Sequence, residues 1–598
     1  MMKLSDYVFN FIANLGVKHV FMLPGGGCMH LVDSLGKNKR LKYITNLNEQ
    51  AVSISVESYA QATNNIGVGL VTTGPGGTNA ITGVAAGWVD STPMLIISGQ
   101  VKTKDMIKDS KLRQKGFQEI DIISLVKPIT KYAVTITDAE DIRYHLEKAV
   151  YLATTGRPGP VWIDIPLDIQ AAIIDEKKLK GYIPPKSNFD DDIDKKIELL
   201  IEMIKESKKP VILAGNGIRL AKAEKLFYSV IKKLNIPILL TWKAIDFLDE
   251  NDPLNFGRPG AIASRYANFI QQKSDLFISI GARLDTGQTA YNHKNFAPYA
   301  KKVIVDVDKN EIDKLEMDIE LKIVSDAYRF LDILNRKIRK IEFKRKDKWL
   351  SFCKSLKNKY PIIKDEYYKM KDFVNPYVLI DILSKKLSEN DAIIPGSSGL
   401  CSEITMQSFK VKKGQRVYNN EGFGAMGFGL PASIAGAIAL NRRTICITGD
   451  GGIQMNIQEL ETLRRLNIPL KCFILDNKGY GSIVNTQNNY FNGNYVGSNE
   501  SSGLTLPDMK KIAHAYGLKF YELRNNKDLI NKIDEILDYE GPVICNVKIP
   551  EIYTTIPRTK SKIENGKIIT LPMEDLWPYL DREEFNNIMS EKEGYYEI

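Results

Sequence analysis

The residues that build disulfide frameworks and histidine-cysteine metal centres are scarce in this sequence. Its 598 residues include six cysteines and five histidines, with no Cys-x-x-Cys pair and no His/Cys spacing typical of a metal site. Most of the cysteines lie in apolar runs, such as Cys446 in TICIT and Cys472 in KCFIL. We therefore expect buried thiols in a reducing cytoplasm rather than a disulfide-bonded secreted protein.

Long apolar segments are lacking as well. The N-terminus reads as an amphipathic helix that leads into a strand, without the uninterrupted apolar core and cleavage site of a signal peptide. Residues 422–440 carry no charge, but glycines before Pro431 interrupt them. We predict a buried loop and a packed helix there, and no membrane partner.

Positive charge exceeds negative charge only modestly. The chain has 82 Lys and Arg against 72 Asp and Glu, a net charge of +10. The lysines are spread along the chain and are densest in RKIEFKRKDK, near residue 340, which is typical of a solvated helix face or a linker. The charge predicts some attraction for anionic cofactors and substrates, and no nucleic-acid partner.

The chain divides into three blocks and a tail. Residues 1–170, 195–335 and 376–550 each alternate short β-branched runs with helical patterns, which is the mark of parallel α/β layers. The predicted fold class is therefore α/β, with three doubly wound parallel-sheet domains. The tail, 551–598, is polar and aromatic, and we expect it to form a hairpin or lid that docks on the body.

The strongest local signal lies in the third block. The strand TICIT ends in Gly449-Asp450-Gly451, and the next strand, KCFILDN, ends at Asn477, two residues before Gly479. At the carboxyl ends of neighbouring parallel strands, a carboxylate, an amide oxygen and a backbone carbonyl can meet one Mg²⁺. The glycines let a diphosphate approach the backbone next to a helix start. Gly-Asp-Gly alone is a common turn, so the second strand makes the pattern specific.

This pattern resembles the fingerprint of thiamine-diphosphate enzymes, GDG followed by NN, with Asp476 in place of the first asparagine. The resemblance implies thiamine diphosphate and Mg²⁺ as cofactors. It also implies a metal site formed by Asp450, Asn477 and the carbonyl of Gly479. The diphosphate contacts that it implies are Gly449, Gly451 and Gly452 on one side and, after the strand DAIIPG, Ser398 and Gly399 on the other.

A glutamate follows a predicted strand in the first block. The segment ITNLNEQAVSISVESYAQAT places Glu49 before a helix rich in small residues, and TGPGGTN follows at residues 73–79. Both segments resemble those of acetolactate synthases, where they read HEQ and TSGPGATN. The resemblance implies that Glu49 is the acid on N1′ of the aminopyrimidine, which allows the cofactor to lose its C2 proton. Outside this context it would be an ordinary first-turn glutamate.

A glycine-rich loop before the GDG strand carries a methionine. Residues 424–431 read GAMGFGLP and resemble the GTMGFGLP of acetolactate synthases. The resemblance implies that Met426 holds the cofactor in a bent shape, and that backbone groups of Gly424 and Met426 bind the pyrimidine edge. A methionine in an apolar run is otherwise usually core packing.

The resemblance to acetolactate synthases runs through all three blocks, which it identifies as pyrimidine-binding, central and diphosphate-binding domains. It implies that Gly26 and Gln118 face the active site. It also implies active sites between the first block of one subunit and the third block of another, hence a homodimer or homotetramer. Decarboxylases of this fold transfer protons with histidines, and the few histidines here, none of them paired, favour a carboligase instead.

The central block resembles the flavin domain of acetolactate synthases. It contains Gly281-Ala282-Arg283 and the run VIVDVDKNEI with Asp306. The resemblance implies that Arg283 touches FAD and that Asp306 reaches its adenosine. Relatives with the same fold bind ADP or no flavin, and GRPG at residues 257–260 departs from the usual flavin loop. FAD and a flavin-free site both remain open.

The predicted reaction is carboligation of 2-keto acids. Pyruvate loses CO₂ and its two-carbon unit joins a second carbonyl, giving 2-acetolactate when the acceptor is pyruvate. Two departures alter the acceptor pocket: Asn485-Thr486 replaces the Gln-Trp that follows the metal asparagine in acetolactate synthases, and Asn48 replaces the histidine before the activating glutamate. Alternatives are a keto-sugar nucleotide as acceptor, and a thiamine-dependent C–C lyase or hydrolase. A non-enzymatic module would have lost the acidic and amide residues of both sites, and these are present.

Overall fold

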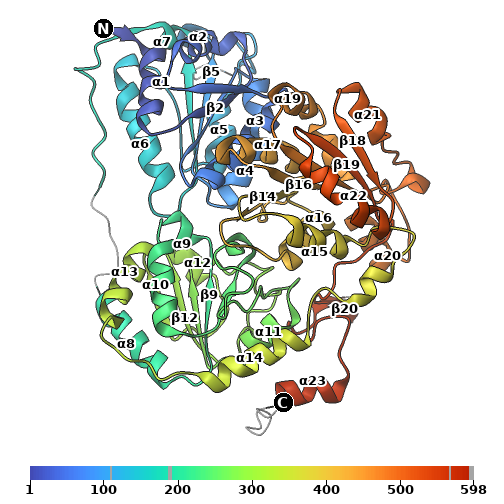
Figure 1. Cartoon of the computed structure of the whole chain (residues 1–598). Coiled ribbons are helices and arrows are strands. Elements are labelled where there is room, and N and C mark those ends of the chain that lie inside the picture. The colour runs from blue at the N-terminus through green and yellow to red at the C-terminus, as the bar shows by residue number, and fades with distance from the viewer. Residues whose placement is uncertain (108–110, 186–191, 565–566, 591–598) are drawn as a thin grey trace.

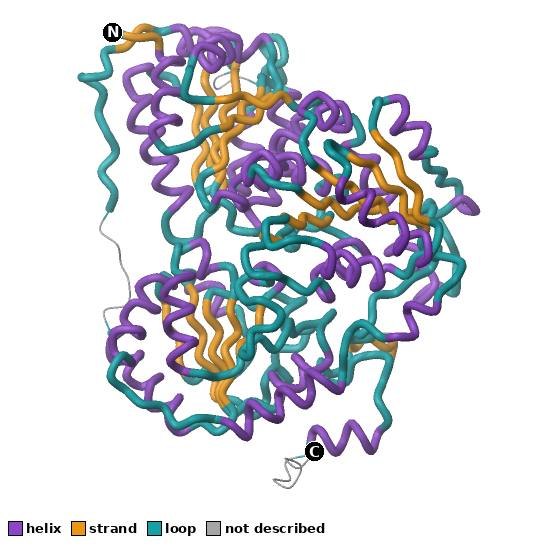
Figure 2. Tube along the Cα trace, in the orientation of Figure 1, coloured by secondary structure: helices purple, strands orange, loops and turns teal. Residues whose placement is uncertain are grey.

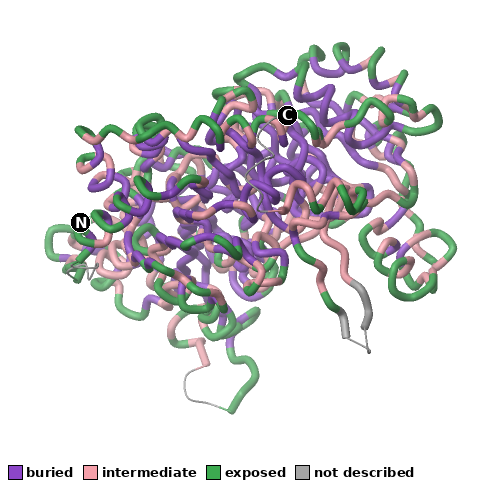
Figure 3. Tube along the Cα trace, turned by 90° about the horizontal axis from the view of Figure 1, so that it is seen from below, coloured by how far each residue is buried: buried purple, intermediate pink, exposed green. Residues whose placement is uncertain are grey.

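Three parallel β-sheets form three domains in the computed structural model, which describes residues 1–107, 111–185, 192–564 and 567–590. Each sheet lies between layers of helices (Figure 1 and Figure 2). The predicted fold class, α/β with three doubly wound parallel-sheet domains, is confirmed. Buried residues are concentrated where the helices cover the sheets (Figure 3).

The first domain has a six-stranded sheet in the order β3-β2-β4-β5-β7-β6. Its strands are β2 (His19–Met22), β3 (Lys42–Thr45), β4 (Gly67–Val71), β5 (Met94–Gln100), β6 (Tyr132–Thr135) and β7 (Pro160–Pro166). Its helices are α1 (Leu4–Asn14), α2 (Met29–Lys37), α3 (Glu49–Thr63), α4 (Pro75–Val89), α5 (Ile122–Val126), α6 (Ile142–Thr154) and α7 (Leu167–Ala171). A short antiparallel pair, β1 (Met2–Lys3) and β8 (Ile173–Ile174), ties the N-terminus to the segment that leaves the domain.

The central domain has a five-stranded sheet in the order β10-β9-β11-β12-β13. Its strands are β9 (Pro210–Ala214), β10 (Ile238–Leu240), β11 (Leu276–Ile280), β12 (Lys301–Asp306) and β13 (Leu321–Val324). Its helices are α8 (Ile193–Glu206), α9 (Gly217–Leu220), α10 (Glu224–Leu234), α11 (Arg265–Gln272), α12 (Lys309–Asp313) and α13 (Ala327–Ile338). The lysine-rich stretch near residue 340 connects α13 to α14 (Asp347–Lys359), as expected for a linker.

The third domain has a six-stranded sheet in the order β15-β14-β16-β17-β19-β18. Its strands are β14 (Ala392–Pro395), β15 (Arg416–Val417), β16 (Thr444–Gly449), β17 (Leu470–Asp476), β18 (Lys519–Leu523) and β19 (Val543–Lys548). Its helices are α15 (Pro376–Lys386), α16 (Leu400–Ser408), α17 (Gly429–Leu440), α18 (Asp450–Ile453), α19 (Glu459–Leu466), α20 (Gly481–Phe491), α21 (Met509–Ala515) and α22 (Asn526–Asp538). Apolar runs such as TICIT are buried on both faces, which is why they do not alternate with polar residues.

The uncharged stretch 422–440 contains a loop and the buried helix α17, as predicted. Small side chains let α17 pack closely on α3 of the first domain. Ser58 Oγ donates a hydrogen bond to the carbonyl of Ala432 at 2.7 Å, and Ser55 Oγ donates one to the carbonyl of Pro431 at 3.3 Å. Nowhere in the described part of the chain does a helix combine the length and the apolar character that crossing a membrane requires.

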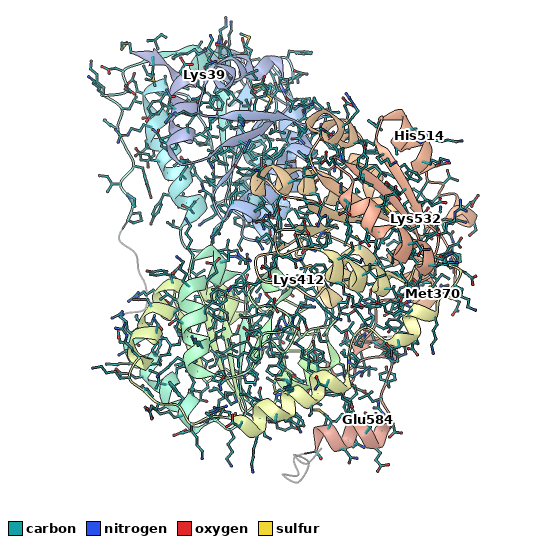
Figure 4. The ribbon with its side chains drawn as sticks, in the orientation of Figure 1. Lys39, Met370, Lys412, His514, Lys532 and Glu584 are labelled. Atoms are coloured by element: carbon teal, nitrogen blue, oxygen red, sulfur yellow. The ribbon has the colours of Figure 1, made fainter. Side chains whose placement is uncertain are left out.

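The tail returns to the central domain. It forms the antiparallel pair β20 (Ser561–Glu564) and β21 (Lys567–Thr570), and then α23 (Arg582–Met589). Asn268 Nδ2 in α11 donates a hydrogen bond to the carbonyl of Met573 at 2.6 Å, and the Met573 side chain is buried. Glu584 of α23, which Figure 4 labels, pairs with Lys359 of α14 at 3.0 Å. The tail thus docks on the central domain and on the helix that leaves it.

A buried ion cluster joins the central domain to the third domain. Asp246 pairs with Arg219 at 2.8 Å and with Arg416 of β15 at 2.7 Å, and its side chain is 1% exposed. Burial alone would raise the pKa of Asp246, but the two guanidinium groups outweigh burial and hold that pKa below its ordinary value. The carboxylate is therefore the counter-charge that both arginines share.

We expect Asp246→Asn to lower the free energy of unfolding by about 3–5 kcal/mol, because it removes the counter-charge of Arg416 and leaves Arg219 with only its longer pair to Glu224, at 3.5 Å. Denaturant unfolding followed by circular dichroism measures the change. The control is Asp332→Asn, which removes an exposed partner of Arg336. This control should change the free energy of unfolding by less than about 0.5 kcal/mol. Superimposable unfolding curves for the two variants would contradict the prediction.

Candidate active site

Two neighbouring strands of the third domain end at the same edge of its sheet. In the parallel pair β16 and β17, Gly449 lies opposite Leu475, so Asp450 and Asn477 leave their strands side by side. Asp450 is buried, and its Oδ2 accepts the backbone N–H of Gly479 at 3.2 Å. The predicted metal ligands are therefore neighbours in space.

Oxygen-bearing groups converge at this edge. One terminal atom of the Asn477 amide lies 3.1 Å from Asp450 Oδ1 and 3.1 Å from the carbonyl oxygen of Gly479. With nitrogen at that position the amide donates two hydrogen bonds. With oxygen there, three oxygens face one another, and a cation between them would relieve their repulsion.

The electrostatics of this oxygen set suit a divalent cation. Burial, with Asp476 nearby, raises the pKa of Asp450 to about 7, so its charged form gains from a positive partner. A carboxylate, an amide and a carbonyl are the hard oxygen ligands that Mg²⁺ accepts. Within the described residues, no three His, Cys, Asp or Glu side chains are grouped to hold a metal. The mixed set around Asp450 is therefore the candidate metal site.

The glycines predicted to contact the diphosphate flank Asp450. Gly449 faces open space, since a β-carbon built there would meet no atom within 4 Å. Gly451 packs against the ring of Tyr480, which a β-carbon would approach to 2.5 Å, so packing also requires glycine here. Gly452 makes ordinary van der Waals contacts. Gly449 is thus the glycine that leaves room for a ligand beside the backbone.

Ser398 and Gly399, the predicted contacts on the second side, come directly before α16. Gly399 has a φ of +70°, and a β-carbon there would lie 2.9 Å from Ser482 Oγ. Ser482 belongs to the first turn of α20, which follows Asn477 in the chain. The loop before α16 and the metal-site loop therefore lie next to each other, as the predicted diphosphate site requires.

A buried asparagine holds the loop that carries Met426. Gly424 and Gly427 adopt φ values of +65° and +85°, and Met426 between them is partly exposed. Asn456 Nδ2 donates a hydrogen bond to the carbonyl of Gly427 at 3.0 Å and another to Gln50 Oε1 at 3.4 Å. Asn456 thereby ties the predicted pyrimidine loop to the first turn of α3.

Glu49 is the first residue of α3 and is 8% exposed. Asn48 caps this helix by accepting the backbone N–H of Gln50 at 2.8 Å. Asn79 Nδ2 of α4 donates a hydrogen bond to Glu49 Oε2 at 3.0 Å, which fixes the carboxyl group. Between the described residues, no hydrogen bond joins Glu49 to the third domain. Glu49 and Asn79 thus form one half of the candidate active site, a half-site built from the first domain alone.

Gly26 and Gln118 lie at the same edge of the first sheet, and both are exposed. Gly27 packs against the Thr73 hydroxyl, and a β-carbon on Gly27 would overlap it. Gly74 packs in the same way against the carbonyl of Gln118. These contacts bring the ends of β2 and β4 and the Gln118 loop together, close to the start of α3.

A cavity of about 1030 Å³ lies where the three domains meet. Its wall includes Arg157, Arg283, Asp306, Ser398, Gly399 and Glu421. Burial raises the pKa of Asp306 to about 6, and its Oδ1 accepts the N–H of Asp308 at 3.0 Å. The two predicted flavin contacts therefore share one cavity with two predicted diphosphate contacts.

Glu421, which no motif indicated, lines the same cavity. Asp90 accepts the backbone N–H groups of Glu421 and Gly422, both at 3.1 Å. Lys243 Nζ donates a hydrogen bond to Asp90 at 2.9 Å. Burial, and then Asp285 and Asp90, raise the pKa of Glu421 to about 8. The Glu421 carboxyl therefore holds its proton at neutral pH.

Three protein-family models match the chain, one for each domain. They are the N-terminal TPP binding domain of thiamine pyrophosphate enzymes over residues 2–125, their central domain over 197–334 and their C-terminal TPP binding domain over 397–547. The chain belongs to the thiamine pyrophosphate enzymes.

Among thiamine pyrophosphate enzymes, the chain is similar to acetolactate synthases. It is 34% identical to the acetolactate synthase large subunit of Buchnera aphidicola subsp. Schizaphis graminum, over 88% of this chain and 91% of that protein. It is 30% identical to the large subunit of Lactococcus lactis subsp. lactis, over 96% of each chain. It is 33% identical to the probable large subunit of Methanocaldococcus jannaschii, over 92% of each. The predicted family is confirmed.

Sequence reasoning missed three residues of this thiamine pyrophosphate enzyme that the structure places at its half-sites and cavity. Asn79 lies inside the TGPGGTN motif, but the motif did not predict the hydrogen bond from Asn79 to Glu49. Asn456 and Glu421 carry no local signal. Asn456 bonds Gln50 of the first domain as well as Gly427 of its own, and Asp90 of the first domain accepts the Glu421 N–H. A single sequence does not record such contacts between domains.

Proposed function

We propose that this chain is the catalytic subunit of an acetolactate synthase, which joins two pyruvate molecules into 2-acetolactate with loss of one CO₂. The pair of half-sites carries the proposal: Glu49 with Asn79 at one sheet edge, and the oxygens of Asp450, Asn477 and Gly479 at another. Relatives named acetolactate synthase over nearly the whole chain support the same reaction. We place the enzyme in the cytoplasm, where its six free, buried thiols would stay reduced.

Each half-site has a distinct task in this proposal. Thiamine diphosphate, when bound, supplies a carbon nucleophile and stabilises the negative charge left as CO₂ departs. The oxygens of Asp450, Asn477 and Gly479 would hold Mg²⁺ against the diphosphate. The Glu49 carboxyl would hold a proton at N1′ of the aminopyrimidine, while Asn79 keeps that carboxyl in place.

We infer that a complete site needs two subunits, in a homodimer or homotetramer. Apolar side chains are exposed close to both half-sites. Leu47 and Phe117 of the first domain are 47% and 86% exposed, and Phe423 and Met455 of the third domain are each 44% exposed. Burying such side chains favours association, and a symmetric pair would bring the first domain of one chain to the third domain of its partner.

We infer that the cavity between the domains binds an adenine dinucleotide such as FAD. Its volume of about 1030 Å³ suits a ligand of that size. Asp306 at the end of β12 offers a carboxylate to ribose hydroxyls, the usual contact at that position of a parallel sheet. Arg283 in the same wall offers positive charge to the phosphates. Arg157, which also lines the wall, already pairs with Asp308 and Glu311.

With thiamine diphosphate and Mg²⁺, the purified protein is expected to convert pyruvate into 2-acetolactate and CO₂, with little acetaldehyde. Proton NMR of the products and a CO₂ assay, each with and without FAD, measure the outcome and show whether turnover needs the flavin. Cofactor binding is checked separately by the rise in Tm. If the cofactors stabilise the protein but pyruvate is not consumed, the proposal is wrong, and a keto-sugar nucleotide is the next acceptor to test.

A further inference from the structure

The start of the tail lies against the loop that carries the predicted metal ligands. The backbone carbonyl of Glu551, the first tail residue, accepts a hydrogen bond from Asn477 Nδ2 at 3.3 Å. Two residues further on, the carbonyl of Tyr553 accepts one from Asn485 Nδ2 of α20 at 2.8 Å. The tail therefore contacts the amide group of a predicted metal ligand before it reaches the central domain.

The Asn477 amide has two orientations, which use different partners. With its nitrogen toward Asp450, it donates hydrogen bonds to Asp450 Oδ1 and to the Gly479 carbonyl, both at 3.1 Å. With its oxygen there, its nitrogen donates to the Glu551 carbonyl instead. Without a cation the first orientation is the better bonded, because it makes two hydrogen bonds and one of them is to a carboxylate. A cation requires the second orientation, since a divalent ion such as Mg²⁺ binds the amide oxygen.

The surroundings of the outer amide atom favour nitrogen at that position. A β-carbon built on Gly481 would lie 2.5 Å from Asn477 Nδ2, so glycine is needed to leave room for this end of the amide. If the amide oxygen pointed outward, it would face the carbonyl oxygen of Glu551, and two acceptors in contact repel each other. The Glu551 carbonyl therefore disfavours the cation-free orientation and stabilises the orientation that presents oxygen to a metal.

Several contacts fix the tail beside this amide. The hydroxyl of Tyr377, a core residue of the third domain, donates a hydrogen bond to the carbonyl of Ile556 at 2.6 Å and accepts the Ile556 N–H at 2.9 Å. Asn485 holds the tail backbone nearer to Glu551. The Glu551 side chain pairs with Lys478 at 3.6 Å, but both side chains are exposed and such a pair contributes little. The position of the Glu551 carbonyl thus depends mainly on side chains that bond the tail backbone.

We propose that Asn485 and the backbone carbonyl of Glu551 position Asn477 for the cation. The Glu551 carbonyl holds the amide with its oxygen toward the metal, and Asn485 holds that carbonyl in place. When a cation binds, the amide turns, exchanges its two inward hydrogen bonds for a bond to the metal, and donates to Glu551. Positioning of this kind raises metal affinity, because the ligand spends less time in the wrong orientation. The inference rests on the cation site of the proposed function.

The test measures Mg²⁺ affinity in the full chain by isothermal titration at a saturating concentration of thiamine diphosphate. Asn485→Ala leaves every predicted metal ligand in place and is expected to lower the affinity by about tenfold. Asn477→Asp presents an oxygen to the cation in either orientation, so no orientation remains to be selected. Adding Asn485→Ala to Asn477→Asp should therefore change the affinity by less than about twofold. A similar loss in both backgrounds would mean that Asn485 merely stabilises the loop, and would overturn the inference.

Matched variants separate this inference from a folding defect and from the proposed function. Asn489→Ala makes the same change at an exposed position one turn further along α20, and it should keep the wild-type affinity for Mg²⁺. Asn485→Gln retains an amide donor and should bring the affinity back to within about threefold of wild type. Unchanged affinity in Asn485→Ala overturns this inference alone. If wild type with thiamine diphosphate binds no Mg²⁺, the proposed cation site and this inference fall together.

Discussion

With glutamine in place of Glu49, acetolactate formation is expected to fall by about 10³-fold. The amide has nearly the shape of the carboxyl, and its oxygen can still accept the Asn79 hydrogen bond, which is 3.0 Å long in the native protein. It cannot transfer a proton to N1′ of the aminopyrimidine, so the step that prepares the cofactor is lost. The measurement is kcat at saturating pyruvate and thiamine diphosphate.

Cofactor binding distinguishes lost chemistry from a lost fold in this experiment. Glu49→Gln leaves Asp450 and Asn477 unchanged, so thiamine diphosphate and Mg²⁺ should raise the Tm of the variant as they raise that of wild type. Glu57→Gln is the matched control, because it changes a buried carboxyl on the same helix that the fold uses, and this variant should still turn over. A Glu49→Gln enzyme with a kcat within tenfold of wild type would show that Glu49 is not the activating acid.

The second large effect is expected at the metal site. Asp450→Asn removes the single negative charge from the converging oxygens, and we expect the affinity for thiamine diphosphate in the presence of Mg²⁺ to fall by about 100-fold or more. The substitution hardly changes the size of the side chain, so it should weaken cation binding and leave the packing unchanged. Isothermal titration of thiamine diphosphate at a fixed Mg²⁺ concentration measures the loss.

The neighbouring aspartate provides the control for the metal site. Asp476 accepts a hydrogen bond from Asn546 at 2.8 Å and pairs with Lys548, so its charge is already compensated. Asp476→Asn should keep an affinity for thiamine diphosphate within about tenfold of wild type. Equal losses of affinity in the two variants would mean that the total negative charge of this region, rather than a metal ligand at Asp450, governs cofactor binding.

Mixing the two inactive variants tests whether the half-sites come from different chains. In a dimer of one Glu49→Gln chain and one Asp450→Asn chain, one of the two sites would contain both native residues. Random pairing of equal amounts should therefore restore about a quarter of wild-type activity, given two-fold symmetric dimers. If each site were built within one chain, the mixture would stay inactive after subunit exchange.

Much of the third domain could be predicted from sequence because its signals are local. The strands β16 and β17 are apolar runs that end in Gly449-Asp450 and Asp476-Asn477, and their parallel pairing then places the polar ends together. Glu49 could be found in the same way, since it directly follows a strand and begins a helix of small residues. A resemblance to known motifs supplied the roles, which strand patterns alone do not carry.

Contacts between domains had no comparable signal. Asn456 reads as an ordinary polar residue next to an amphipathic helix, and its importance appears only when it bonds Gly427 in its own domain and Gln50 in another. Asp246 reads as an ordinary polar residue until Arg219 and Arg416, far from it in the chain, bury their charges against it. Such partners are chosen by how whole domains pack, and no spacing along the chain encodes that choice.

By itself, the sequence determined the parallel α/β architecture and the family, and it predicted Glu49 and the metal ligands of the two candidate half-sites, because each depends on residues that are close together in the chain. The tertiary structure alone decided that Arg283, Asp306 and Glu421 share a cavity with Ser398. The physical reason is the distance along the chain over which each effect acts. Hydrophobic periodicity and turn chemistry act over a few residues, whereas burial and the pKa of a carboxyl depend on every group that packing brings near it.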